Sequence, residues 1–191
     1  MHLVFATNNK NKIQEIESLL KNKVKLLGLE DINCFDDIPE TQNTIEKNAS
    51  QKSNYIYKNY KVNCFADDSG LEIEALGGKP GVLSARYAGG SKNSDDNINK
   101  VLEEMKGVIN RKAKFKTVIS LIINGQEQQF CGIVDGVILE NKKGRNGFGY
   151  DPIFQPDNSK VSFAEMNLEQ KNKISHRGIA VRKLVRFLKT L

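Results

Sequence analysis

The sequence has little cysteine and no long hydrophobic segment. Its 191 residues include only three cysteines, Cys34, Cys64 and Cys131, which are widely spaced and form no Cys-x-x-Cys or Cys/His cluster. This pattern argues against a disulfide framework and against a zinc site. The longest apolar runs, such as residues 118–123, are far shorter than the roughly 20 residues of a membrane-spanning helix. We therefore expect reduced cysteines and no membrane span.

The first seven residues also lack the features of a secretory leader. They contain no cationic region, no long apolar run and no small-residue cleavage site. The expected location is the cytoplasm.

What the sequence does contain is enough apolar material for a folded core. Hydrophobic residues make up 39% and charged residues 27%, which disfavours disorder and coiled coils. The length predicts one domain over residues 1–191. The net charge of +6 favours a polyanionic partner, either nucleic acid or a small phosphorylated ligand, and composition does not choose between them.

Hydrophobic periodicity predicts a mixed α/β domain with a partly antiparallel sheet. Asn124-Gly125 is a strong hairpin signal, so the strands on either side of it should be antiparallel. The expected strands are residues 3–6, 24–27, 62–66, 71–76, 115–123, 129–134 and 137–139. The expected helices are residues 13–20, 43–60 and 98–105, and a C-terminal helix with Ala180, Leu184, Phe187, Leu188 and Leu191 on one face.

A first polar cluster follows the opening strand. It consists of Thr7, Asn8, Asn9, Lys10, Asn11 and Lys12. Free backbone N–H groups, a hydroxyl and two ammonium groups there would form a phosphate cradle. A Thr or Asn helix cap explains the same residues equally simply.

A second cluster, Asp67-Asp68-Ser69-Gly70, is expected to form a loop after a strand that ends at Ala66. Adjacent carboxylates repel each other, and a few hard oxygen ligands suit Mg²⁺ held jointly with substrate phosphates. The alternative is an Asx turn, for which Asp-Ser-Gly is well suited.

Two further clusters lie in the C-terminal third. Residues 147–152 read Gly-Phe-Gly-Tyr-Asp-Pro, where the ring of Phe148 could stack on a base. An aromatic turn that packs on its own core is the alternative. Residues 175–178 read Ser-His-Arg-Gly at a helix start, where an anion could bind, and the alternative is a solvent-facing cap.

Taken together and in this order, these clusters resemble the signatures of the inosine triphosphate pyrophosphatase family over nearly the whole chain. The matching motifs are Thr7-x-Asn9-x-x-Lys12-x-x-Glu15, residues 66–71, Leu76-Gly77-Gly78-x-Pro80-Gly81 with residues 84–87, residues 147–152 and residues 174–177. The resemblance implies an elongated α/β fold, hydrolysis of ITP, dITP or XTP to the monophosphate and pyrophosphate, Mg²⁺ as cofactor, and a homodimer. It implies neither a nucleic-acid nor a membrane partner.

The same resemblance assigns roles to individual residues. Asp68 would be the catalytic proton acceptor and a metal ligand. The triphosphate would be held by Thr7, Asn8, Asn9, Lys10, Asn11, Lys12 and Lys52. The substrate would further contact Ser69, Phe148, Gly149, Tyr150, Asp151, Lys171, His176 and Arg177.

One stretch departs from the family pattern, because Lys47 stands where an acid is expected before Asn48-Ala49. This leaves open which glutamate completes the metal site. We favour Glu40, with Glu46 as the alternative.

Arg177, or a backbone donor, is expected to select the 6-keto purines over adenine, because adenine would leave the donor unpaired. The rival functions are a non-catalytic nucleotide- or RNA-binding module and a hydrolase of pyrimidine triphosphates.

Overall fold

The structure is a computed structural model that describes residues 2–20 and 24–191. Strands and helices alternate along most of the chain, as the periodicity predicts. The elements in chain order are β1 His2–Phe5, α1 Lys10–Leu20, β2 Lys25–Leu27, α2 Ile45–Tyr60, β3 Cys64–Ile73, α3 Ser94–Glu104, β4 Lys112–Ile123, β5 Gln126–Ile138, β6 Phe154–Pro156, α4 Leu168–Ile174 and α5 His176–Leu188.

The described strands form a six-stranded mixed sheet in the order β2-β1-β3-β4-β5-β6. β1 is parallel to both β2 and β3, whereas β6 is antiparallel to β5. β4 and β5 are joined by Asn124 and Gly125, whose φ values of 50° and 82° suit a type I′ hairpin turn. The predicted hairpin and the mixed α/β fold are both confirmed.

The chain divides into two compact units. Unit 1 comprises Met1–Asp68, Thr117–Gly132 and Arg177–Leu191, and unit 2 comprises Ser69–Lys116 and Ile133–His176. β3, β4 and β5 each contribute residues to both units. The prediction of one domain over residues 1–191 stays a prediction.

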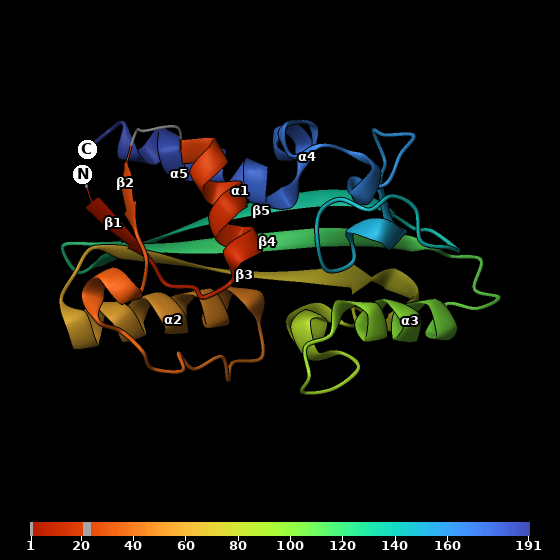
Figure 1. The fold of residues 1–191 in the computed structure, drawn as a ribbon, viewed down its shortest axis with the longest axis horizontal. Helices are drawn as coiled ribbons and strands as arrows, with labels where there is room; N and C mark the ends of the chain where they lie inside the picture. The colour runs from red at the N-terminus through yellow and green to blue at the C-terminus, as the bar shows by residue number, and fades with distance from the viewer. Residues whose placement is uncertain (1, 21–23) are drawn as a thin grey trace. The chain divides into compact units, whose positions relative to one another are not determined.

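Unit 1 has helices on both faces of its part of the sheet (Figure 1). Side chains alternate between the two faces of a strand. Leu3 and Phe5 of β1 accordingly pack with Ile16 of α1 and with residues of α5, whereas Val4 packs in a cluster with Ile56 of α2. The sheet of unit 1 is therefore buried on both sides, and polar side chains along it are enclosed by helices.

Unit 2 has a core of its own. Ile98 and Val101 of α3 pack with Ile73 of β3, Phe115 of β4 and Phe154 of β6. Arg111 donates from Nη1 to the carbonyl oxygen of Met105, at the end of α3, and from Nη2 to that of Leu139, at 3.0 and 2.9 Å. These bonds tie the helix to the segment after β5.

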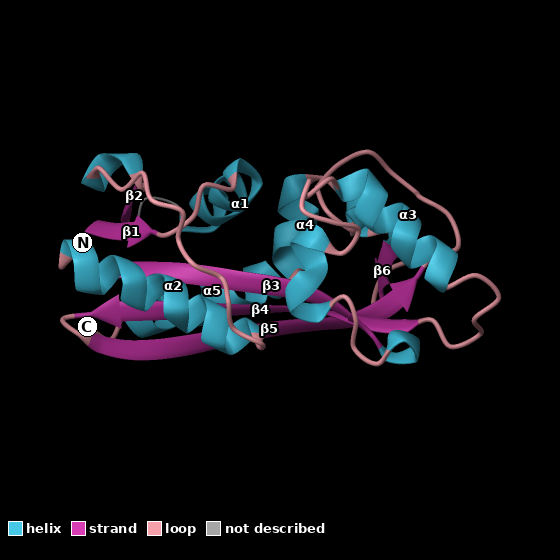
Figure 2. Ribbon diagram, turned by 90° about the horizontal axis from the view of Figure 1, so that it is seen from below, coloured by secondary structure: helices cyan, strands magenta, loops and turns pink. Residues whose placement is uncertain are grey.

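The largest correction concerns β3, which runs without interruption from Cys64 to Ile73 (Figure 2). The predictions of a strand ending at Ala66, a loop or Asx turn over residues 67–70 and a separate strand over 71–76 are wrong. Asp67 and Asp68 are buried within the strand. Their charges are compensated by basic side chains, so the polar run does not break the strand.

Smaller differences lie near the C-terminus. Residues 137–139 are not a separate strand, because β5 extends to Ile138. Leu191 lies beyond α5 and its side chain is 65% exposed, so it is not part of the apolar face. The cysteines are free thiols, as predicted. Within residues 2–20 and 24–191, no helix is both long and apolar enough to cross a membrane.

Candidate active site

The N-terminus of α1 is capped by Asn9. Its Oδ1 accepts from the backbone N–H groups of Asn11 and Lys12 at 3.0 and 3.2 Å, and Thr7 Oγ1 accepts from the Asn9 N–H at 3.2 Å. The capping interpretation is therefore confirmed. The expectation of free backbone N–H groups is wrong for residues 9, 11 and 12. The exposed polar side chains of this segment are those of Asn8, Asn9, Lys10 and Asn11.

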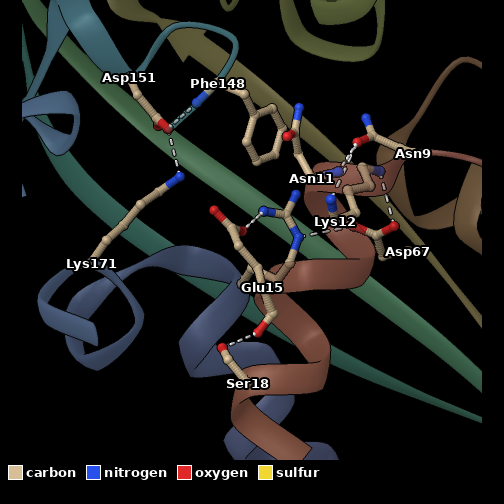
Figure 3. Close-up of polar contacts among 10 residues, drawn as sticks. Asn9, Asn11, Lys12, Glu15, Ser18, Asp67, Phe148, Asp151 and Lys171 are labelled. Carbon is tan, nitrogen blue, oxygen red and sulfur yellow. Dashed lines mark hydrogen bonds and ion pairs between the residues drawn. The ribbon is translucent and has the colours of Figure 1, made fainter. Parts of the chain in front are cut away.

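Asp67 binds two cations that come from helices at opposite ends of the chain. Its Oδ1 accepts from Lys12 Nζ at 2.9 Å (Figure 3), and its Oδ2 accepts from Arg177 Nε at 3.3 Å. Arg177 also pairs through Nη1 with Glu15 Oε2. Asp67, Arg177 and Glu15 are all buried. The four side chains thus form a charge-balanced network of two carboxylates and two cations.

This network sets the pKa of Asp67. Burial alone would raise that pKa, but the Lys12 ammonium and the Arg177 guanidinium outweigh burial and hold the pKa well below its usual range. Burial lowers the pKa of Lys12 below its usual value, although Asp67 opposes this. Asp67 is consequently ionised at neutral pH and poorly suited to accept a proton.

Asp68 faces the other side of the sheet. Phe65 packs with α1 and α5, whereas Ala66 packs in the cluster that contains α2 residues. Strand alternation places Asp67 on the Phe65 side and Asp68 on the Ala66 side. The two carboxylates therefore leave opposite faces of a continuous strand and not a loop, and the metal site proposed there from the sequence stays a prediction.

Lys52 of α2 is the principal cation beside Asp68. Its side chain is buried, and its Nζ donates to Glu40 Oε1 at 2.5 Å. Burial lowers the pKa of Lys52, but the carboxylates of Asp68 and Glu40 outweigh burial, so the pKa is raised. Lys52 is therefore charged at neutral pH, and its predicted role in binding phosphate stays a prediction.

The pKa of Asp68 is raised above its usual value. Burial is the largest cause; Lys52 and Lys12 oppose it, and the nearby Glu40 and Asp67 carboxylates add to the rise. A carboxylate with increased proton affinity is the better proton acceptor of the two.

The donor set around Asp68 fits a divalent cation shared with a substrate. In the described residues, no group of three or more His, Cys, Asp or Glu side chains could hold a metal by itself. Mg²⁺ is usually bound by one or two carboxylates together with substrate phosphates and water. Glu40 raises the pKa of Asp68, and a divalent cation between hard oxygen ligands would relieve that repulsion.

Glu40 suits this role better than Glu46. Glu46 lies in the first turn of α2, where its carbonyl oxygen accepts from Gln129 Nε2 at 3.3 Å, and Lys47 is exposed. Glu40 is among the charged neighbours that shift the pKa of Asp68 most, whereas Glu46 and Lys47 are not. The identity of the metal ligands stays a prediction.

In unit 2, the segment around Phe148 is anchored by Asp151. Asp151 Oδ2 accepts from the Phe148 N–H at 2.8 Å and from Lys171 Nζ at 2.6 Å (Figure 3). The Lys171 ammonium lies 4.9 Å from the centroid of the Phe148 ring. At Gly147, where φ is +72°, a Cβ would approach Asp151 Oδ2 to 2.1 Å. Glycine is therefore required there for the carboxylate to reach the loop.

The residues of the last cluster are buried, so the solvent-facing alternative is wrong. The imidazole of His176 stacks on Phe115 with ring centroids 4.5 Å apart. Tyr150 donates from its hydroxyl to the Ser84 carbonyl oxygen at 2.8 Å, and Ser69 is half-buried on β3. Arg177 belongs to unit 1, where Asp67 and Glu15 hold its guanidinium, which does not favour a contact with a base.

The model of the Ham1 family matches residues 3–187 of this chain. The chain belongs to the Ham1 family. A dITP/XTP pyrophosphatase of Flavobacterium johnsoniae is 57% identical over 188 residues, which are 98% of each chain. The solved Ham1 protein of Staphylococcus aureus is 39% identical with a TM-score of 0.91, covering 100% of this chain and 99% of the other. That of Coxiella burnetii is 36% identical with a TM-score of 0.92, covering 100% of both. The family resemblance seen in the sequence is confirmed.

One member of the buried network, Glu15, has no role predicted from the sequence. Glu15 follows Lys12 by three residues on α1, so helical spacing placed both on one face. That spacing is the only local feature of the sequence that links Glu15 to the network. The partner of Glu15, Arg177, lies 162 residues away in sequence, so the pairing could not be read from the pattern.

Proposed function

We propose that this chain hydrolyses ITP, dITP and XTP to the nucleoside monophosphate and pyrophosphate in a Mg²⁺-dependent reaction. The observation that carries the proposal is the position of Asp68, a buried carboxylate on β3 that lies near Lys52 and Glu40, which contact each other at 2.5 Å. The proposal is also supported by the 57% sequence identity of this chain to a dITP/XTP pyrophosphatase over almost its whole length.

The first task of the site is charge neutralisation. A nucleoside triphosphate carries about four negative charges near neutral pH, and these repel an attacking water. The ammonium group of Lys12 pairs with Asp67 and that of Lys52 pairs with Glu40, and both ammonium groups are close enough to Asp68 to oppose the rise in its pKa. We assign both to the triphosphate, together with the polar side chains at the start of α1.

Asp68 is the proposed catalytic residue. It orients the water that attacks the α-phosphorus and accepts its proton as the bond from the α-phosphorus to the bridging oxygen breaks, with pyrophosphate as the leaving group. Glu40 and Asp68 would hold Mg²⁺, which when bound neutralises phosphate charge and acidifies a bound water. Asp67 is ionised and held by Lys12 and Arg177, so it leaves proton transfer to Asp68.

Base selection is assigned to the Phe148 segment of unit 2. Phe148 is half-buried and Asp151 holds its backbone N–H, and we assign its ring to stacking on the purine. A donor directed at position 6 accepts a keto purine and leaves adenine facing an unpaired N–H. Lys171, whose ammonium lies 4.9 Å from the centroid of the Phe148 ring, is the donor that we assign to this role.

The family resemblance supports a homodimeric assembly of the enzyme, and its location is the one predicted from the sequence. We place it in the cytoplasm as a homodimer that acts on the nucleotide pool.

The reaction is tested by hydrolysing ITP in ¹⁸O-labelled water and analysing the products by mass spectrometry. We expect IMP and pyrophosphate, with the label in IMP, because the water attacks the α-phosphorus. Formation of IDP and phosphate, or label in the pyrophosphate, would contradict the proposed reaction.

A further inference from the structure

Three side chains of α2 hold three consecutive residues of the loop that precedes the helix. Lys52 Nζ contacts Glu40 Oε1 at 2.5 Å. Gln51 forms two hydrogen bonds with Thr41: its Oε1 accepts from the Thr41 N–H at 2.9 Å, and its Nε2 donates to Thr41 Oγ1 at 2.8 Å. Asn48 Oδ1 accepts from the Gln42 N–H at 2.8 Å.

The spacing of these residues explains the arrangement. Positions 48, 51 and 52 are separated by three and four residues, so they lie on one face of the helix. Thr44 caps α2 by accepting from the Lys47 N–H at 3.2 Å. The loop thereby turns back along the first turns of its own helix.

We propose that Gln51 is a positioning residue that fixes Glu40 for metal binding. Its two bonds to Thr41 hold both the backbone and the side chain of the residue adjacent to Glu40. The inference rests on the proposed function, because it takes Glu40 as a ligand of Mg²⁺. It adds a residue outside every motif that identified the site.

The contact between Lys52 and Glu40 cannot by itself fix Glu40 for metal binding. A cation that binds the Glu40 carboxylate competes with Lys52 for the same oxygens, which weakens the ion pair when the site is filled. The bonds of Gln51 and Asn48 do not involve that carboxylate, so they persist when it changes partner. Side chains that hold the backbone next to a metal-binding residue reduce the conformational entropy that is lost when the metal binds.

The first test measures backbone amide exchange in metal-free, nucleotide-free protein. In Gln51→Ala the Thr41 amide should exchange about tenfold faster or more, because its acceptor is gone, while the Gln42 amide keeps its Asn48 acceptor. Gln51 is half-buried and alanine favours helices, so α2 should remain folded. The matched control is Gln128→Ala, which truncates an exposed glutamine of β5.

The second test titrates Mg²⁺ while pyrophosphate release from ITP is followed. The Mg²⁺ concentration for half-maximal rate should rise about tenfold in Gln51→Ala, with kcat at saturating Mg²⁺ within about twofold of the parent. Thr41→Val, which loses only the hydroxyl, should show a smaller rise. Thr41→Ser keeps the hydroxyl and should behave as the parent does.

The outcomes separate the inference from the function on which it rests. If the parent requires Mg²⁺ and Gln51→Ala has the same requirement, the inference is overturned and the proposed function stands. Faster Thr41 exchange without a changed Mg²⁺ requirement would also overturn it, since Gln51 would then only order the loop. A parent that turns over ITP fully without Mg²⁺ would overturn both.

Discussion

Asp67 and Asp68 are adjacent on β3, yet their pKa values shift in opposite directions. Asp67 is bonded to Lys12 and Arg177, which lower its pKa. Asp68 is on the opposite face, and burial raises its pKa. The same residue type is thus a permanent counterion at one position and a carboxylate with increased proton affinity at the next, because a strand turns successive side chains to opposite sides.

The first prediction concerns the stability that Asp67 contributes. Asp67→Asn should lower the free energy of unfolding at pH 7 by about 3 kcal/mol, because it leaves two buried cations without their carboxylate. The folded-state pKa of Asp67 is lowered, so its stabilisation is present above the unfolded-state pKa of about 3.9 and is lost as pH falls toward the folded-state value. Urea unfolding of parent and variant from pH 7 to pH 2.5 should show the difference shrinking below about pH 4.

An exposed carboxylate provides the control for this measurement. Asp95 pairs with Lys142 on the surface, where its side chain is 76% exposed. Asp95→Asn should change stability by about 0.5 kcal/mol or less. A difference between parent and Asp67→Asn that stays constant down to pH 2.5 would contradict the assignment of a lowered pKa.

The second prediction compares two glycines of the Phe148 segment. Both have positive φ, +72° at Gly147 and +59° at Gly149, so alanine strains the backbone at each. Only at Gly147 would the new methyl group meet Asp151, while at Gly149 it enters open space. We expect Gly147→Ala to lower kcat/KM for ITP about a hundredfold by displacing the anchor of Phe148, and Gly149→Ala to lower it less than tenfold. Equal losses in steady-state assays would refute the anchoring role of Asp151.

The third prediction separates the packing and polar roles of His176. Its buried ring stacks on Phe115, so His176→Ala should cost about 2–4 kcal/mol of stability through the cavity it leaves. His176→Phe restores a ring of similar shape and should recover most of that stability. Because His176 is also assigned to the substrate, we expect KM for ITP to be raised about tenfold in both variants. A phenylalanine variant with parental KM would assign His176 to packing alone.

Local chemistry made much of the fold predictable. The hairpin at Asn124-Gly125 was found because both residues tolerate the positive φ of a type I′ turn. The cap of α1 was likewise foreseen as an alternative, because Asn9 precedes the helix. These features depend only on residues a few positions apart.

The arrangement of the site could not be predicted in the same way. A run of Asp-Asp-Ser-Gly normally ends a strand, and here the strand continues because Lys12, Arg177 and Lys52 compensate the buried carboxylates. Those cations lie on three different helices, so only the folded chain brings them to β3. Functional residues that break a local pattern are where such reasoning is expected to fail.

The measurement that tests the central claim most directly is pyrophosphate release from ITP, XTP, dITP, ATP, GTP and dTTP, with and without Mg²⁺, by the parent and by Asp68→Asn. The account predicts Mg²⁺-dependent turnover of ITP, XTP and dITP, at least about a hundredfold faster than that of ATP or dTTP. Asp68→Asn should reduce it about a thousandfold while urea unfolding shows a folded protein, since the buried carboxylate's raised pKa means that its charge does not stabilise the fold. Turnover that survives in Asp68→Asn, or that does not distinguish ITP from ATP, would contradict the account.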